Sequence, residues 1–138
     1  MQRHVLNIGL AVISALGCAA APPAAPTAVP LHGTWKGNPV GGCSEVLEFR
    51  PDNVLRVESS REVLQGTYVA RSDSGAQPAL QVERIITHSN QQPDCNGRIT
   101  VPTGARQIAF AFFAGNDTLR LCFDRQGNRC IGTFSRTR

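Results

Sequence analysis

From residue 31 onward, apolar and polar side chains alternate with a period of two, in short stretches separated by turn residues. This alternation is typical of half-buried β-strands, whereas an amphipathic helix repeats about every 3.6 residues. The pattern predicts strands at 33–37, 44–50, 54–59, 62–71, 79–87, 98–101, 106–114, 118–124 and 129–135. Clusters of Pro, Gly, Asn and Asp, at 51–53 and 115–117 for example, mark the tight turns between them.

Strands joined by short turns have to bury one face against each other, which leaves a sandwich or a sheet closed on itself. Closure removes both sheet edges. We therefore expect an all-β fold, either a sandwich or a small antiparallel up-and-down barrel of about eight strands. The first strand carries Trp35, the only tryptophan, and we expect the later strands to close over this large apolar side chain.

The last apolar strands divide their residues between two faces. Ile108, Phe110 and Phe112 alternate with Gln107, Ala109 and Ala111, and we expect the larger set to point inward. In the next strand the inward set is expected to be Leu119, Leu121 and Phe123. These side chains either fill a solid core or line a site for a small apolar ligand. The candidate lining residues are Phe49, Tyr68, Ile108, Phe110, Phe112, Leu119 and Leu121.

The first thirty residues have a different character. Residues 1–17 combine a basic start with an apolar stretch too short to cross a bilayer, which predicts a signal peptide. Residues 18–31 are uncharged and rich in Ala and Pro, which favours a semi-rigid extended tether. The folded domain is thus expected at 32–138.

Four cysteines lie in that domain, and this even number in a small exported chain predicts two disulfides. A last hairpin centred on Gln126 places Cys122 opposite Cys130, Leu121 opposite Ile131 and Leu119 opposite Thr133. This register favours the pairs Cys122–Cys130 and Cys43–Cys95. Pairing of Cys43 or Cys95 with the last strand is the alternative.

Composition argues against several activities. The net charge of +4 is scattered over single arginines, and aromatic residues are 6% of the chain, so a nucleic-acid surface is not expected. The three histidines lack metal-ligand spacing, and no nucleophile elbow occurs, so we expect no metal, no cofactor and no enzyme. A carboxylate pair is the catalytic alternative, but acidic residues alternating along strands usually face solvent. They are Glu45, Glu48, Glu58, Glu62 and Glu83.

The segment Ser14-Ala15-Leu16-Gly17-Cys18 resembles the lipobox of bacterial lipoproteins, with Ala15 and Leu16 in exchanged places. The resemblance implies that Cys18 carries the lipid and anchors the chain in a membrane. Ala19 after the cysteine implies the outer membrane, with the domain facing the periplasm. Ordinary cleavage at nearby small residues, with loss of Cys18, is the alternative.

The domain itself resembles small lipocalin-like domains of bacterial lipoproteins, and this resemblance implies the up-and-down barrel of about eight strands. The motifs are Gly33-Thr34-Trp35, residues 47–53, Gly66-Thr67-Tyr68 and residues 132–136. The resemblance implies that Arg136, or else Arg138, covers the Trp35 indole. The hairpin register given above instead places Arg136 on the outward face with Cys130.

Two functions follow for a monomeric, non-enzymatic envelope protein. In one, the barrel binds a small apolar ligand, as lipocalin-like folds often do. In the other, the barrel is a scaffold and a loop binds a protein partner, as in envelope inhibitors of lysozyme-like cell-wall hydrolases and in immunity proteins. The candidate contact residues lie in the polar loop at 88–97 and are His88, Asn90, Gln92 and Asp94.

Overall fold

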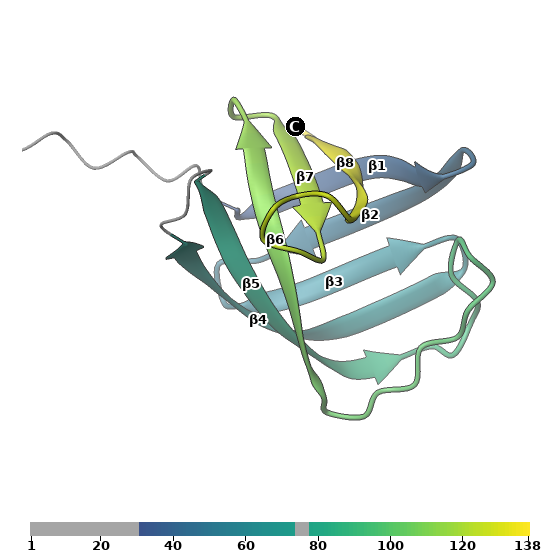
Figure 1. The fold of residues 1–138 in the computed structure, drawn as a ribbon. Coiled ribbons are helices and arrows are strands. Elements are labelled where there is room, and N and C mark those ends of the chain that lie inside the picture. The colour runs from purple at the N-terminus through teal and green to yellow at the C-terminus, as the bar shows by residue number, and fades with distance from the viewer. Residues whose placement is uncertain (1–30, 74–77) are drawn as a thin grey trace, which may run out of the picture.

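The computed structural model of the chain describes residues 31–73 and 78–138, and within these ranges eight strands form one closed antiparallel barrel (Figure 1). The strands pair in chain order, and β8 returns to pair with β1. Their bounds are β1 Gly33–Val40, β2 Cys43–Phe49, β3 Val54–Ser59, β4 Glu62–Asp73, β5 Ala79–Ser89, β6 Arg106–Ala114, β7 Thr118–Cys122 and β8 Cys130–Arg136. The expected all-β, up-and-down barrel is confirmed.

Eight of the nine predicted strands are present, and the one predicted at 98–101 is not. Residues 98–101 make only an isolated bridge, between Pro93 and Ile99, inside a long connection from β5 to β6. The predicted signal peptide at 1–17, Cys18 and nearly all of the tether at 18–31 lie outside the described residues. In the described part of the chain, no helix is long and apolar enough to span a bilayer.

The two ends of the barrel are formed by different parts of the chain. Because the strands alternate in direction, β1 begins and β8 ends at the same end of the barrel, which we name the Trp35 end. The opposite end, the loop end, holds the β1–β2 and β3–β4 turns, the β7–β8 loop and the connection 90–105. The chain enters the described domain at Leu31, beside the Trp35 end.

The interior is filled with apolar side chains. Trp35, Leu119 and Phe134 are fully buried, and Leu47 and Leu55 are 1% exposed. The Phe113 ring lies 5.9 Å from the Trp35 ring, so the sixth strand also contributes an aromatic side chain to this core. The sequence left open whether these side chains fill a solid core or line a ligand site, and this packing corresponds to the solid core.

Strand β6 faces the core with the opposite side from the one predicted. Ala109 and Ala111 are buried in the main core, whereas Ile108 is 45% exposed on the outer face. Ala111 pairs with Leu80 on one side and with Leu121 on the other. A small side chain fits between these two leucines in a narrow barrel, and a phenylalanine there would overfill the core.

Phe110 and Phe112 therefore lie outside the main core, in a second cluster with Ala79 and Cys122. The β7–β8 loop crosses in front of β6 (Figure 1), and its Gly127 lies next to the Phe112 ring. The Arg120 guanidinium lies 5.4 Å from the Phe112 ring centroid, and a Cβ at Gly127 would lie 3.5 Å from the same ring. The prediction that Ile108, Phe110 and Phe112 point inward was wrong, because the interior takes the small Ala109 and Ala111, while Phe110 and Phe112 pack with Ala79 and Cys122 on the outer side.

Both predicted disulfides, Cys43–Cys95 and Cys122–Cys130, are present. Cys122 pairs with Cys130 as expected, but the hairpin register then shifts by one residue at a β-bulge. Leu121 lies opposite Gly132 and Leu119 opposite Phe134, so the predicted partners Ile131 and Thr133 were wrong.

The bulge changes which residues of β8 face inward. An extra residue in one strand moves every later side chain to the other face. The outward disulfide therefore coexists with a fully buried Phe134 on the same strand. Phe123, also expected inside, is 55% exposed because β7 ends one residue before it.

Candidate functional site

The Trp35 end of the barrel is closed by Trp35 and Arg136, which are cross-strand neighbours in β1 and β8. The Arg136 guanidinium lies 4.1 Å from the centroid of the Trp35 ring. The indole Nε1 donates a hydrogen bond to the Leu31 carbonyl oxygen at 2.9 Å. The predicted cover of the indole by Arg136 is confirmed, and the β8 bulge is what turns this side chain inward.

Arg136 also connects the start of the described domain and the last strand to the β6–β7 turn. Its Nη1 donates to the His32 carbonyl at 2.6 Å, and its Nε donates to the Asn116 carbonyl at 3.0 Å. Hydrogen bonds from a charged donor are stronger than neutral ones. These contacts give Arg136 a structural role.

The seven candidate lining residues do not form one lining. Phe49, Tyr68, Leu119 and Leu121 belong to the main core, while Ile108, Phe110 and Phe112 lie on the outer face. Phe49 and Tyr68 pack edge to face at 5.1 Å, and the Tyr68 hydroxyl donates to the Arg50 carbonyl at 2.8 Å. Burial, with a smaller effect of Asp52, raises the pKa of the Tyr68 hydroxyl. The four inward residues therefore serve as packing.

Toward the loop end the interior becomes polar. Glu62 is buried, and its Oε1 accepts a hydrogen bond from the Thr100 N–H at 3.3 Å. Glu45 continues the inward side of β2 that Leu47 and Phe49 occupy, and its Oε2 lies 3.5 Å from the Ser59 hydroxyl. The expectation that Glu45 and Glu62 face solvent was wrong. Each glutamate lies two residues from a buried leucine of its own strand, and this alternation is the sequence signal that could have placed both side chains inside.

A positive charge accompanies these carboxylates. Arg84 lies between Val82 and Ile86 on the inward side of β5, and its Nε donates a hydrogen bond to the Gln107 Oε1 at 2.9 Å. Burial lowers the pKa of the Arg84 guanidinium, and the carboxylates of Glu45 and Glu62 oppose that effect. We name Glu45, Glu62 and Arg84 the mouth cluster.

Burial raises the pKa of the Glu45 carboxyl above its ordinary value of 4.5. The nearby Arg84 charge and the Ser59 hydroxyl act in the opposite direction, and Asp94 and Glu62 add to the increase. The ionised form of Glu45 is therefore less stable in the folded barrel than in the unfolded chain. The other shifted carboxyl is that of Asp124, whose pKa is lowered by backbone N–H donors, first of all that of Asn128.

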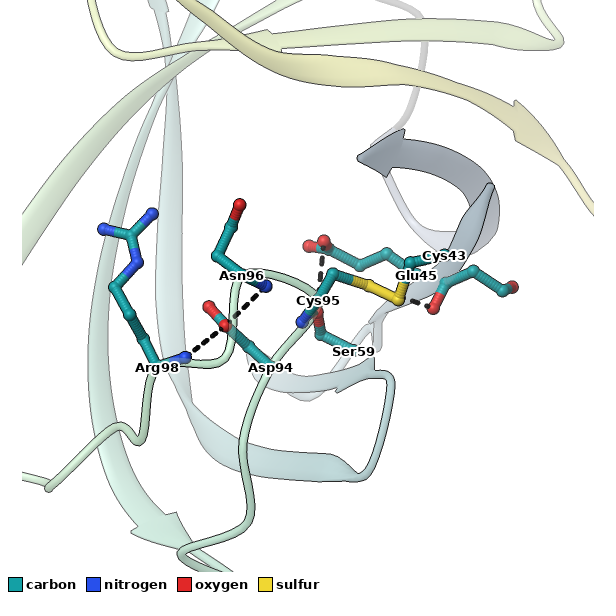
Figure 2. Close-up of a disulfide and its surroundings, with 8 residues drawn as sticks. Cys43, Glu45, Ser59, Asp94, Cys95, Asn96 and Arg98 are labelled. Atoms are coloured by element: carbon teal, nitrogen blue, oxygen red, sulfur yellow. Dashed lines mark hydrogen bonds between the residues drawn. A yellow bond between two sulfur atoms is a disulfide. The ribbon is translucent and has the colours of Figure 1, made fainter. Parts of the chain in front are cut away.

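The connection 90–105 is held against the loop end at several points. The Cys43–Cys95 disulfide joins it to the start of β2, and the Cys95 N–H donates to the Ser59 Oγ at 3.2 Å (Figure 2). Next to the disulfide, the Asp94 Oδ1 accepts hydrogen bonds from the N–H groups of Asn96 and Arg98, both at 2.8 Å (Figure 2).

Two of the four predicted contact residues stabilise this connection themselves. Asn90 accepts a hydrogen bond from the Val63 N–H at 2.9 Å and donates one to the Arg61 carbonyl at 2.9 Å. Asp94 is engaged as described above, whereas His88 and Gln92 are exposed. The connection also exposes two apolar side chains that sequence reasoning assigned to a strand. Ile99 is 55% exposed and Val101 is 64% exposed.

A second exposed feature lies on the outer face of β4, β5 and β6. Val69 pairs with Glu83, and Glu83 pairs with Ile108, so these three residues form one row across the strands. Arg106 Nε lies 3.2 Å from Glu83 Oε1, and Arg71 Nη1 lies 3.8 Å from Glu83 Oε2. No sequence motif indicated this feature, because its residues come from three strands.

Comparison of the chain with protein-family models, with curated proteins and with solved structures finds no match. In residues 31–73 and 78–138, no group of three or more His, Cys, Asp or Glu side chains could hold a metal ion. The geometry of the barrel is therefore the basis on which its function is inferred.

Proposed function

We propose that this chain is a lipid-anchored, non-enzymatic binding protein of the bacterial envelope, and that the connection 90–105 binds a protein partner. The observation that carries the proposal is a loop fixed by a disulfide that leaves Ile99 and Val101 uncovered. A loop already ordered by covalent and hydrogen bonds loses little further entropy when it binds. Exposed apolar side chains on such a loop are suitable anchors for an interface.

The packing of the interior favours this function over an apolar ligand inside the barrel. The side chains of Trp35, Leu47 and Phe134 already occupy the space around the barrel axis at the Trp35 end. The loop end contains the charged mouth cluster, which is a poor environment for an apolar molecule.

A lipid on Cys18 would also orient the loop. The described chain starts at Leu31, next to the Trp35 end, and the connection 90–105 lies at the opposite end of the barrel. A tether that enters at the Trp35 end keeps the point of attachment away from the loop end. The loop is then accessible to envelope proteins such as a lysozyme-like cell-wall hydrolase.

The first experiment measures hydrolysis of cell-wall suspensions by lysozyme-like hydrolases with and without the purified protein. We expect inhibition by the wild-type protein and its loss in the double variant Ile99→Ser, Val101→Ser. The matched control is Phe123→Ser, because Phe123 is as exposed as Ile99 but belongs to the β7–β8 loop. Equal inhibition by all three proteins would contradict the role of the loop.

Two further measurements test the remaining parts of the proposal. Organic-solvent extraction of the purified protein should yield no recurrent lipid, and a stoichiometric lipid would favour the small-ligand function instead. The variant Cys18→Ala should leave the membrane fraction, and its retention there would contradict lipid anchoring.

A further inference from the structure

The outer face of β4, β5 and β6 carries a patch that the proposed function does not use. We define it as the basic patch, made of Val69, Arg71, Glu83, Arg106 and Ile108. Val69, Glu83 and Ile108 are cross-strand neighbours, and both arginines contact the central glutamate. Val69 is 44% exposed and Ile108 is 45% exposed, so two large apolar side chains project into solvent from one sheet face.

The patch has more positive than negative charge. The single Glu83 carboxylate, whose side chain is 17% exposed, serves two guanidiniums whose side chains are each 64% exposed. Arg71 approaches it through Nη1 and Arg106 through Nε, so each of these exposed guanidiniums keeps further N–H groups that this contact does not use. Guanidinium groups bind anions that offer several oxygens, above all carboxylates and phosphates.

A second copy of the chain does not fit this patch. A two-fold symmetric contact would bring Arg71 and Arg106 against the same arginines of the other copy. Like charges placed together across an interface are unfavourable. The occupant should therefore combine negative charge with an apolar layer.

We propose that the basic patch docks on an anionic phospholipid surface, with Arg71 and Arg106 at the lipid phosphates and Val69 and Ile108 inserted beside them. Peripheral membrane surfaces combine these same two elements, basic side chains for the headgroups and apolar side chains for the acyl boundary. The proposal rests in part on the proposed lipid anchor. An extended tether of the predicted length has a reach of at most about 40 Å, which keeps the domain near the headgroups.

The experiment uses the chain from residue 18 onward with Cys18→Ser, so that neither a covalent lipid nor the apolar stretch at 1–17 contributes, and co-sedimentation with two kinds of vesicle. One kind is pure phosphatidylcholine and the other contains phosphatidylglycerol. We expect binding to the phosphatidylglycerol vesicles alone, and weaker binding at high salt because headgroup charges are screened. Equal binding to both kinds of vesicle, or no binding to either, would overturn the proposal.

Variants then locate the contact. Arg71→Gln with Arg106→Gln should weaken binding roughly tenfold or more, since each basic residue near an anionic surface contributes about 1 kcal/mol. Val69→Ser with Ile108→Ser should weaken it by a similar factor while leaving the charge unchanged. The control, Arg56→Gln with Arg61→Gln, removes the half-buried Arg56 and the exposed Arg61 elsewhere on the barrel and should have a clearly smaller effect.

An equal loss in the control would show that only net charge matters and would overturn the assignment to the patch. Capture of an acidic protein by the patch, without vesicle binding, would assign the face to a protein and overturn the lipid proposal. Ile99→Ser with Val101→Ser should bind vesicles as the parent protein does. The two proposals can therefore fail separately.

Discussion

Replacing Arg136 by Met tests the closure of the barrel most directly. Methionine keeps an unbranched side chain that can pack over the indole, but it removes the charge that lies 4.1 Å from the Trp35 ring. It also removes the donors to the His32 and Asn116 carbonyls. These groups join the start of the described domain, the β6–β7 turn and the last strand.

The magnitude follows from the contacts. A partly desolvated cation–π contact contributes about 1 kcal/mol. Each hydrogen bond from the guanidinium contributes about 1 to 1.5 kcal/mol, because Arg136 is half-buried and the freed carbonyls can bind water. The variant should therefore lose about 3 kcal/mol. For a domain of roughly 100 residues, this corresponds to a Tm lower by about 12 °C.

The assay is thermal and urea unfolding followed by tryptophan fluorescence, for which the single Trp35 is a site-specific probe. Arg138→Met is the control, because Arg138 is 90% exposed and only 3.6 Å from the Asp117 carboxylate at the surface. Such a pair contributes about 0.5 kcal/mol or less. If both variants shift the Tm equally, or Arg136→Met leaves the Tm unchanged, the closure role of Arg136 is refuted.

Three further predictions concern stability. Gly66→Ala should lower the free energy of unfolding, measured in urea, by about 2 to 3 kcal/mol, because the new Cβ would clash with the Ile85 carbonyl at the β4–β5 bulge. A decrease below about 0.5 kcal/mol would contradict this close approach. Replacing Cys43 and Cys95 by serine should lower the free energy of unfolding by about 4 kcal/mol, and replacing Cys122 and Cys130 by about 2.5 kcal/mol, because the first disulfide spans 52 residues and the second 8. The reverse order of the two losses would contradict the chain-entropy argument. Glu45→Gln should be more stable than wild type at neutral pH, because the raised pKa of Glu45 makes its ionisation unfavourable in the fold, so wild-type stability falls as pH rises through and above 4.5. The advantage should vanish in chemical unfolding below pH 4.5, where Glu45 is protonated in both states, and a constant difference across pH would refute this origin.

The strand pattern and the disulfides were predictable because they depend on local signals. Alternation and turn residues located all eight observed strands, and Cys122 and Cys130 lie at equal distances from the centre of one hairpin. The site was harder to predict. Ile99 and Val101 resemble strand residues in sequence, and only the disulfide and the Asp94 hydrogen bonds show that they lie in a fixed loop.

The face of β6 shows the limit of pattern reasoning. Alternation separates Ile108, Phe110 and Phe112 from Ala109 and Ala111, but it does not state which set the barrel can accommodate. That choice depended on Leu80 and Leu121, which come from neighbouring strands, and on Ala79 and Cys122, against which Phe110 and Phe112 pack on the outer side.

The sequence by itself determined that the chain from residue 31 forms antiparallel strands and located eight of them to within a few residues, and it favoured the two observed cysteine pairs, because a period of two, turn residues and hairpin symmetry act over a few neighbouring residues. The tertiary structure alone decided which side of β6 is buried, that a bulge turns Arg136 over Trp35, and that Glu45 and Glu62 lie inside with Arg84. These outcomes depend on how much space the other strands leave in a narrow interior. That space is a property of the closed barrel and of no single strand.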